Sequence, residues 1–323
     1  MMSKTVAVSI AAAGLLLTCG LSPASAQGRT LKDRFVGAWK LVNIETRNAK
    51  GEVIPPAAGA NQDRIGYIVF DDAGYMAVTI MPLGRKKAAG AQMTDEEAQA
   101  ALAGYAGYFG TFTFNEKEQS VTYHVEGSVD PALARDQKRF FEMSGNRLTL
   151  KPPPGPSGSQ QRFTWERMPD ITNPTAEQKK FVGFWKLISN ERRNDKGEVL
   201  GTNPGQTGYI IYTAAGFMTV HMVQPDRKPY AAAQATPQEA RQNLRTYTNY
   251  FGPFYIHEVD GYVVHDQFGS LGVGRGGYSP QQRFYRFVGN RLLLQPPPTY
   301  NADGTVTQGT ITWEKVGKTA GTP

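Results

Sequence analysis

Two long segments of this chain are almost the same, and this internal repeat constrains the fold more than any other feature. The segment FVGAWKLVNIETRNAKGEVI begins at Phe35, and the segment FVGFWKLISNERRNDKGEVL begins at Phe181. They are identical at 13 of 20 positions, a match too long to arise by chance. The chain is therefore a tandem duplication, and each candidate residue can be compared with its counterpart in the other copy.

The first residues have the pattern of a secretory signal. Lys4 precedes an apolar run over residues 6–17, and Ala24-Ser25-Ala26 follows as a small-residue cleavage site. We therefore expect residues 1–26 to be a signal peptide that is cleaved after Ala26, and the mature protein to be periplasmic or secreted. The run is too short to cross a bilayer comfortably, and no other long apolar run follows. We expect no transmembrane segment.

Cysteine content and charge narrow the class of protein further. The single cysteine, Cys19, lies inside the predicted signal, so the mature chain must be stabilised by its core and not by disulfides. The formal net charge is +7, which suits anionic small molecules or envelope surfaces. The longest basic run is only Arg85-Lys86-Lys87, and no nucleic-acid motif accompanies it. We expect no nucleic-acid partner.

The secondary structure of each copy is predicted to be mainly β. Most segments alternate apolar and polar residues, with glycine-containing turns between them, which indicates antiparallel hairpins. One short amphipathic helix is expected in each copy, because Thr94 and Thr236 each begin a Thr-x-x-Glu capping box. In the first copy its apolar stripe is predicted to continue through Tyr105 to Phe109.

About eight strands and one helix in roughly 145 residues suit a small closed barrel that can hold one small ligand. A β-sandwich fits the alternation as well. We expect the first barrel over residues 31–168, a turn-rich linker over residues 169–176 and the second barrel over residues 177–317. The two barrels can also pack on each other.

Recurring motifs in both copies identify a family resemblance. They are a Gly-x-Trp opening, a Gly-x-Met turn, a Tyr-Phe-Gly segment, an arginine-bearing strand and a closing Trp-Glu-Arg or Trp-Glu-Lys. In the first copy these are Gly37-Ala38-Trp39, Gly74-Tyr75-Met76, Tyr108-Phe109-Gly110, Arg139 and Trp165-Glu166-Arg167, and in the second Gly183-Phe184-Trp185, Gly216-Phe217-Met218, Tyr250-Phe251-Gly252, Arg283 and Trp313-Glu314-Lys315. Each copy resembles the lipocalin-like domain family. The resemblance implies two tandem lipocalin-like antiparallel β-barrels with hydrophobic pockets and no single activity. Neither copy keeps the family's adjacent His-His pair.

The hairpin around Asp260-Gly261 predicts which polar residues point into the barrels. A two-residue turn there pairs Ile256 with His265 and gives one apolar face. This face contains His265 in the second copy and Tyr123 in the first. His124, His257 and Asp266 fall on the opposite, outer face.

Arg139 and Arg283 share the more apolar face of their strands, so we expect both to point inward. An inward guanidinium needs a partner. One explanation is a cation–π cap on Trp39 or Trp185, which the family resemblance favours. The other explanation is an anionic ligand group bound by the guanidinium.

The tyrosines at the end of each predicted helix are the remaining inward candidates, either as pocket-lining hydrogen-bond donors or as core aromatics. The complete predicted set of ligand-binding residues is Tyr105, Tyr108, Tyr123, Arg139, Tyr247, Tyr250, His265 and Arg283.

Three functions remain open at this stage. The first is an exported binding protein for a small hydrophobic or amphipathic molecule, which can be anionic and is held in a β-barrel pocket. The second is an enzyme of the isomerase, cyclase or lyase type that needs no cofactor, with His265, Arg283 and Tyr250 as its catalytic set. The third is a structural envelope protein. The four histidines lack metal-ligand spacing, so we expect neither a metal site nor a cofactor.

Overall fold

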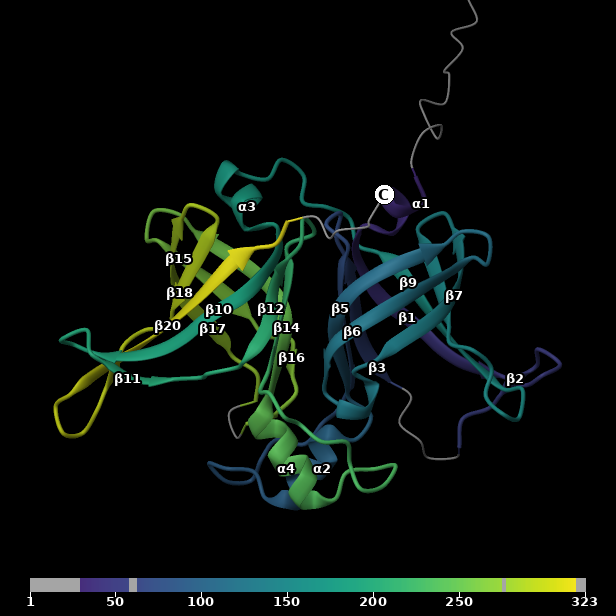
Figure 1. The fold of residues 1–323 in the computed structure, drawn as a ribbon, viewed down its shortest axis with the longest axis horizontal. Helices are drawn as coiled ribbons and strands as arrows, with labels where there is room; N and C mark the ends of the chain where they lie inside the picture. Colours follow the sequence, from purple (N-terminus) through teal and green to yellow (C-terminus); the bar gives the residue numbers. More distant parts are fainter. Residues whose placement is uncertain (1–29, 58–62, 275–276, 318–323) are drawn as a thin grey trace, which may run out of the picture.

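A computed structural model describes residues 30–57, 63–274 and 277–317, and the predicted signal peptide lies outside these residues. Each copy forms a closed antiparallel barrel of eight strands, so the prediction of two tandem β-barrels is confirmed. Figure 1 shows the two barrels side by side, with α2 and α4 below the contact between them and α1 and α3 at the opposite end.

The first barrel runs in the order β1-β3-β4-β5-β6-β7-β8-β9, and β9 pairs back with β1. Its strands are β1 (Gly37–Arg47), β3 (Arg64–Phe70), β4 (Tyr75–Pro82), β5 (Ala106–Asn115), β6 (Ser120–Ser128), β7 (Asp136–Ser144), β8 (Arg147–Lys151) and β9 (Gln160–Arg167). A short strand, β2 (Val53–Ile54), extends the far end of β1.

The second barrel repeats this order as β10-β12-β13-β14-β15-β17-β18-β20, and β20 pairs back with β10. Its strands are β10 (Gly183–Asn194), β12 (Thr207–Tyr212), β13 (Phe217–Val223), β14 (Tyr247–His257), β15 (Tyr262–Asp266), β17 (Pro280–Val288), β18 (Arg291–Gln295) and β20 (Val306–Lys315). Three short strands add to it: β11 (Val199–Thr202), β16 (Gly269–Ser270) and β19 (Thr299–Tyr300).

The helices are short and capped by threonine. The elements are α1 (Leu31–Phe35), α2 (Asp95–Leu102), α3 (Ala176–Phe181), α4 (Pro237–Thr246) and a 3₁₀ turn, η1 (Pro131–Leu133). The capping boxes of α2 and α4 form as predicted. The predicted continuation of the first helix to Phe109 is wrong, because α2 ends at Leu102. Gly104 follows with a φ of 70°, a left-handed conformation that ends the helix, and Phe109 lies in β5.

The predicted hairpin register is wrong by two residues, although the predicted faces are right. His265 pairs with Phe254, and Ile256 pairs with Val263, because the turn takes four residues and not two. A strand alternates its faces with a period of two, so a shift of two residues keeps each side chain on its predicted side. His265 therefore still points into the second barrel, and Tyr123, which pairs with Phe112, points into the first.

Each barrel has its own apolar core, closed at one end by a short helix. The ring of Trp39 donates through Nε1 to the carbonyl of Phe35 at 2.8 Å, and Trp185 makes the same bond to Phe181 at 2.7 Å. These bonds fix α1 and α3 over the barrel ends, where Phe35 and Phe181 are fully buried. The opposite end of each barrel lies near α2 or α4 (Figure 1).

A third core lies between the barrels, where the outer faces of β3–β5 pack on those of β12–β14. We call this contact the inter-barrel interface. Tyr67 stacks on Phe217 across it, with ring centroids 3.9 Å apart, and Phe109 meets Tyr209 edge to face. These strands are thus apolar on both faces because both faces are covered. The interface buries aromatic area that would otherwise be exposed, and it holds the barrels together.

Candidate binding site

The inner wall of the second barrel carries a chain of hydrogen bonds centred on His265. The ring Nε2 lies 2.8 Å from the hydroxyl of Tyr212, and Nδ1 lies 3.0 Å from the hydroxyl of Tyr250. Burial, reinforced by the positive charge of Arg283, lowers the pKa of His265 to about 3. The ring is therefore neutral near pH 7, with one nitrogen donating and the other accepting, and the two tyrosines fix its orientation.

Arg283 lies beside this chain, on the neighbouring strand β17 opposite Val263. Its guanidinium donates to the carbonyl of Gln282 at 2.8 Å and to Oε1 of Gln281 at 3.3 Å. Burial raises the pKa of the Tyr250 hydroxyl, and the nearby Arg283 partly offsets that rise. The structure thus brings the sequence-predicted residues His265, Tyr250 and Arg283 together on one wall.

The first barrel has a different version of the same wall. Phe70 stands where the second barrel has Tyr212, and Tyr123 stands where it has His265. The Tyr123 hydroxyl is buried without a hydrogen-bond partner among the described residues. Arg139 lies over the Tyr123 ring at 5.6 Å and donates to Gln137 at 2.6 Å. The predicted residues are again neighbours, but the histidine–tyrosine chain is missing.

The proposed cap of Arg139 on Trp39, and of Arg283 on Trp185, is wrong. The guanidinium of Arg167 lies 4.4 Å from the Trp39 ring, and the ammonium of Lys315 lies 5.1 Å from the Trp185 ring. These cations belong to the closing Trp-Glu-Arg and Trp-Glu-Lys motifs, because β9 and β20 pair back with the opening strands.

Tyr105 and Tyr247 do not face the barrel interiors with Tyr108 and Tyr250. They lie three residues earlier in each copy, on the opposite side of the chain, and point into the inter-barrel interface. The Tyr105 hydroxyl donates to Oδ1 of Asn249 in the other barrel. The Tyr247 hydroxyl lies 2.9 Å from Nδ1 of His221. Tyr105 directly precedes β5 and Tyr247 begins β14, so alternation over three residues puts the two tyrosines of each pair on opposite faces.

His221 is the centre of a buried polar cluster between the barrels that the sequence prediction missed. It points away from the interior of its own barrel, but it is fully buried. Its Nε2 lies 3.3 Å from the hydroxyl of Thr79 in the first barrel and 3.2 Å from Nδ2 of Asn249. One sequence signal was available: Phe217 and Val223 share the outward face of β13 with His221, and apolar residues on an outward face indicate that this face is covered.

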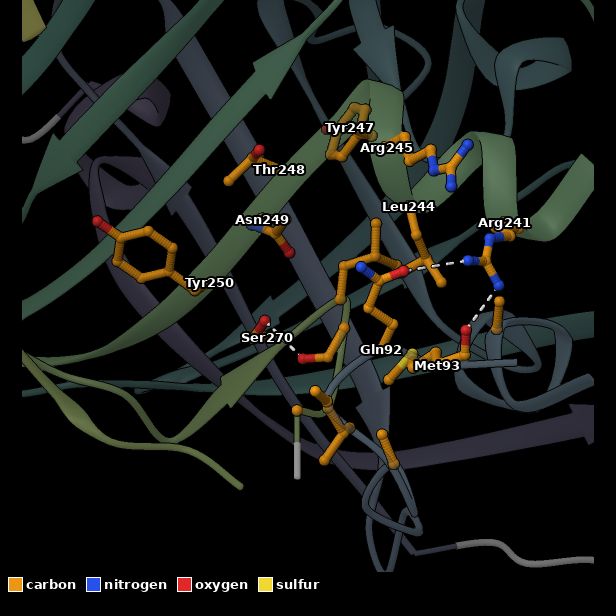
Figure 2. Close-up of a pocket in the computed structure, with 17 residues that line it drawn as sticks. Gln92, Met93, Arg241, Leu244, Arg245, Tyr247, Thr248, Asn249, Tyr250 and Ser270 are labelled. Carbon is orange, nitrogen blue, oxygen red and sulfur yellow. Dashed lines mark hydrogen bonds between the residues drawn. The ribbon is translucent and has the colours of Figure 1, made fainter. Parts of the chain in front are cut away.

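A groove of about 560 Å³ opens beside this wall, between α4, β14 and a loop of the first barrel. Tyr250 lines one end, and Arg241 and Arg245 on α4 line the other (Figure 2). The first barrel contributes Ala88, Ala91, Gln92 and Met93. His265 is not part of the lining; it lies behind Tyr250, to which it is hydrogen bonded. A groove of this size is in the range of small-molecule sites.

The duplication gives this groove a smaller counterpart of about 270 Å³. It lies between α2 of the first barrel and the matching loop of the second, which contributes Ala233, Gln234 and Ala235. Its lining ends at Tyr105 and does not include Tyr108, the counterpart of Tyr250. We call the two the large groove and the small groove.

The family assignment rests on a match over both copies. The family model described as a lipocalin-like domain matches residues 36–168 and again residues 182–316. The chain belongs to the lipocalin-like domain family. No curated protein is similar enough in sequence to count as a match.

Solved structures resemble this lipocalin-like chain only distantly. A protein of unknown function from Nostoc punctiforme is 10% identical over 90% of this chain and 100% of its own, with a TM-score of 0.22. A mutant of transferrin binding protein B from Haemophilus parasuis is 7% identical over 86% of this chain and 75% of its own, with a TM-score of 0.24.

The described residues also meet neither the requirement of a metal site for three clustered ligands nor that of a membrane-spanning helix for length and apolar character. Within residues 30–57, 63–274 and 277–317, no three histidine, cysteine or acidic side chains gather as metal ligands would. In the same described part of the chain, every helix is too short or too polar to cross a bilayer.

Proposed function

We propose that this lipocalin-like protein is an exported binding protein that holds one small hydrophobic or amphipathic molecule in the large groove. One observation carries the proposal: the groove ends on Tyr250, whose hydroxyl is held by a neutral, fully buried histidine. The hydrogen bond to His265 fixes the Tyr250 side chain, which closes one end of a mainly apolar groove with an uncharged surface that suits the apolar part of a ligand.

Export is the second part of this proposal. The predicted signal at residues 1–26 supports a periplasmic or secreted location. The measurement is the N-terminal sequence of the protein recovered from the producing cells, which we expect to begin at Gln27. A chain that retains residues 1–26 and stays in the cytoplasm would contradict this part of the proposal.

The binding test uses lipid-stripped, refolded protein and the neutral apolar dye N-phenyl-1-naphthylamine, whose fluorescence rises in apolar sites. Thr248 is exposed and lines the groove, so Thr248→Trp fills it. We expect about a tenfold loss of dye affinity in this variant. The control Val199→Trp, on the exposed strand β11, should bind within about a factor of two of wild type. Wild-type protein that binds neither the dye nor any extract component would overturn the proposal.

A second candidate function is a cofactor-independent isomerase, cyclase or lyase. It is favoured by the position of the Tyr250 hydroxyl between His265 and Arg283, where a donated proton could be replaced through the imidazole. In such an enzyme the Tyr250 hydroxyl would contact the substrate, and His265 would position and reprotonate that hydroxyl. Conversion of an extract component, followed by mass spectrometry, should then disappear in Tyr250→Phe and in folded His265→Ala.

The structural envelope function has less support. It needs an exposed apolar surface between the two copies, and those faces are buried against each other in the inter-barrel interface.

A further inference from the structure

The large groove is built by both barrels together. The backbone N–H of Ala88 donates to the carbonyl of Val273 at 3.2 Å, which joins the loop of the first barrel to the groove floor of the second. Arg241 on α4 donates to the carbonyl of Met93 at 2.7 Å and pairs with Asp95 at 3.1 Å. Neither barrel alone contains a complete groove.

The small groove shows which part of this arrangement is structural. There Gln99, the counterpart of Arg241, donates to the carbonyl of Ala235 at 2.6 Å. Ala235 is the counterpart of Met93, and each precedes the threonine that caps a helix. The same loop is therefore tied in the same way in both halves, and Arg241 is explained as a structural tie.

Arg245 has no such explanation. Its counterpart is Ala103, which lines the small groove, so the positive charge is present in one groove alone. The Arg245 side chain is exposed, and among the described residues nothing forms a hydrogen bond or ion pair with it. Figure 2 shows its guanidinium on α4 at the end of the groove away from Tyr250.

The two grooves also differ in the acidic residues of their linings. The residues that line the large groove include no acidic side chain, whereas the small groove contains Asp130. The lining of the large groove also includes the apolar residues Leu244, Leu271 and Val273, which are buried or partly buried. An unpaired cation at one end of an apolar channel is complementary to a molecule with an anionic head and an apolar body.

We infer that the large groove binds an amphipathic carboxylate, with its head group at Arg245 and its apolar part directed toward Tyr250, and that the first barrel supplies one wall of this site. This inference rests on the proposed binding function and adds to it the class of ligand and the need for both barrels. It also gives the duplication a role, because the shared groove exists only in the tandem arrangement.

The test compares two probes of equal chain length, decanoate below its micelle concentration and the neutral decanol, by displacement of N-phenyl-1-naphthylamine. Wild type should prefer decanoate. Arg245→Ala, which copies Ala103, should weaken decanoate binding about five- to tenfold and leave decanol binding within about a factor of two. The matched charge control is Arg192→Ala, an exposed arginine on β10, which should leave both affinities unchanged.

The role of the first barrel is tested with a pair of counterpart substitutions. Ala91→Trp adds bulk to the large groove from the first barrel, and Ala233→Trp adds the same bulk to the small groove. Only Ala91→Trp should weaken both probes, by about fivefold or more. Equal decanoate losses in Arg245→Ala and Arg192→Ala, or full binding in Ala91→Trp, would overturn the inference and leave the binding function intact. Failure of both probes to bind wild type would instead refute the binding function itself.

Discussion

Arg85 and Arg227 cross the inter-barrel interface in opposite directions and make matching contacts. Arg85, from the first barrel, donates to the carbonyls of Ser270 and Leu271 in the second. Arg227, from the second barrel, donates to the carbonyls of Ser128 and Val129 in the first. Each guanidinium also lies 5.2 Å from the ring of a tyrosine in its own barrel. The basic loops of the two copies are therefore reciprocal ties between the barrels.

Removal of one tie should destabilise the protein measurably. Arg227→Ala deletes three charge-assisted hydrogen bonds, two of them across the interface, and leaves two carbonyls there without these donors, so the free energy of unfolding should fall by about 2–4 kcal/mol. Urea denaturation measures the change. The exposed Arg286→Ala is the control and should change stability by less than about 0.5 kcal/mol. Equal effects in the two variants would show that the crossing contacts do not stabilise the fold.

Two facing core positions are occupied by Tyr212 and His265 in the second barrel. The equivalent positions of the first barrel hold Phe70 and Tyr123. His265→Tyr alone leaves the Tyr212 hydroxyl without its partner and adds ring volume, and we expect it to lose about 2–4 kcal/mol of stability. Adding Tyr212→Phe recreates the pair of the first barrel. A double-mutant cycle by urea denaturation should therefore show a coupling of about 1–3 kcal/mol. Additive losses would mean that the two positions are independent.

Much of the fold could be predicted from the sequence because local patterns determine it. The period-two alternation and the Thr-x-x-Glu caps depend on neighbouring residues, the repeat can be read directly from the sequence, and all three led to correct elements. The end of α2 was missed because Leu102, Tyr105 and Phe109 continue the apolar spacing of a helix, while Gly104 ends it. Apolar spacing alone does not distinguish a helix from a strand that follows it.

The candidate site was only half predictable. His265, Tyr250 and Arg283 could be placed on one wall, because strand alternation determines their faces. The cation over Trp185 could not be assigned, since its position depends on barrel closure between the first and last strands. The large groove was also missed, because it joins a loop of one copy to a helix of the other and no local pattern records that contact.

The glycine of the Tyr-Phe-Gly motif is required by close backbone contact. A Cβ atom on Gly252 would lie 1.9 Å from the carbonyl oxygen of Asp266, and one on Gly110 would lie 2.0 Å from that of His124. Gly252→Ala should lose at least about 3 kcal/mol or fail to fold. Gly201→Ala is the matched control, because nothing lies within 4 Å of its added methyl group. A melting temperature for Gly252→Ala within about 2 °C of the control would refute this role.

The two buried histidines should make stability depend on pH. Burial lowers the pKa of His221 and of His265 to about 3, well below the value of about 6.5 expected in the unfolded chain. Between these values the unfolded state binds more protons than the folded state. The stability that each neutral histidine contributes is therefore present above about pH 6.5 and is lost as the pH falls toward 3. Each should contribute a slope of about 1.4 kcal/mol per pH unit in this window.

Asp71 acts in the opposite direction, because burial raises its pKa to about 7 and makes its protonated form favourable to folding. The histidine contribution is therefore measured by difference. Urea denaturation of wild type, His221→Gln and His265→Gln at pH 7 and pH 4.5 keeps Asp71 constant. From pH 7 to pH 4.5, the free energy of unfolding of each variant should fall by about 2–3 kcal/mol less than that of wild type. Parallel losses in all three proteins would show that neither ring is held neutral by the fold.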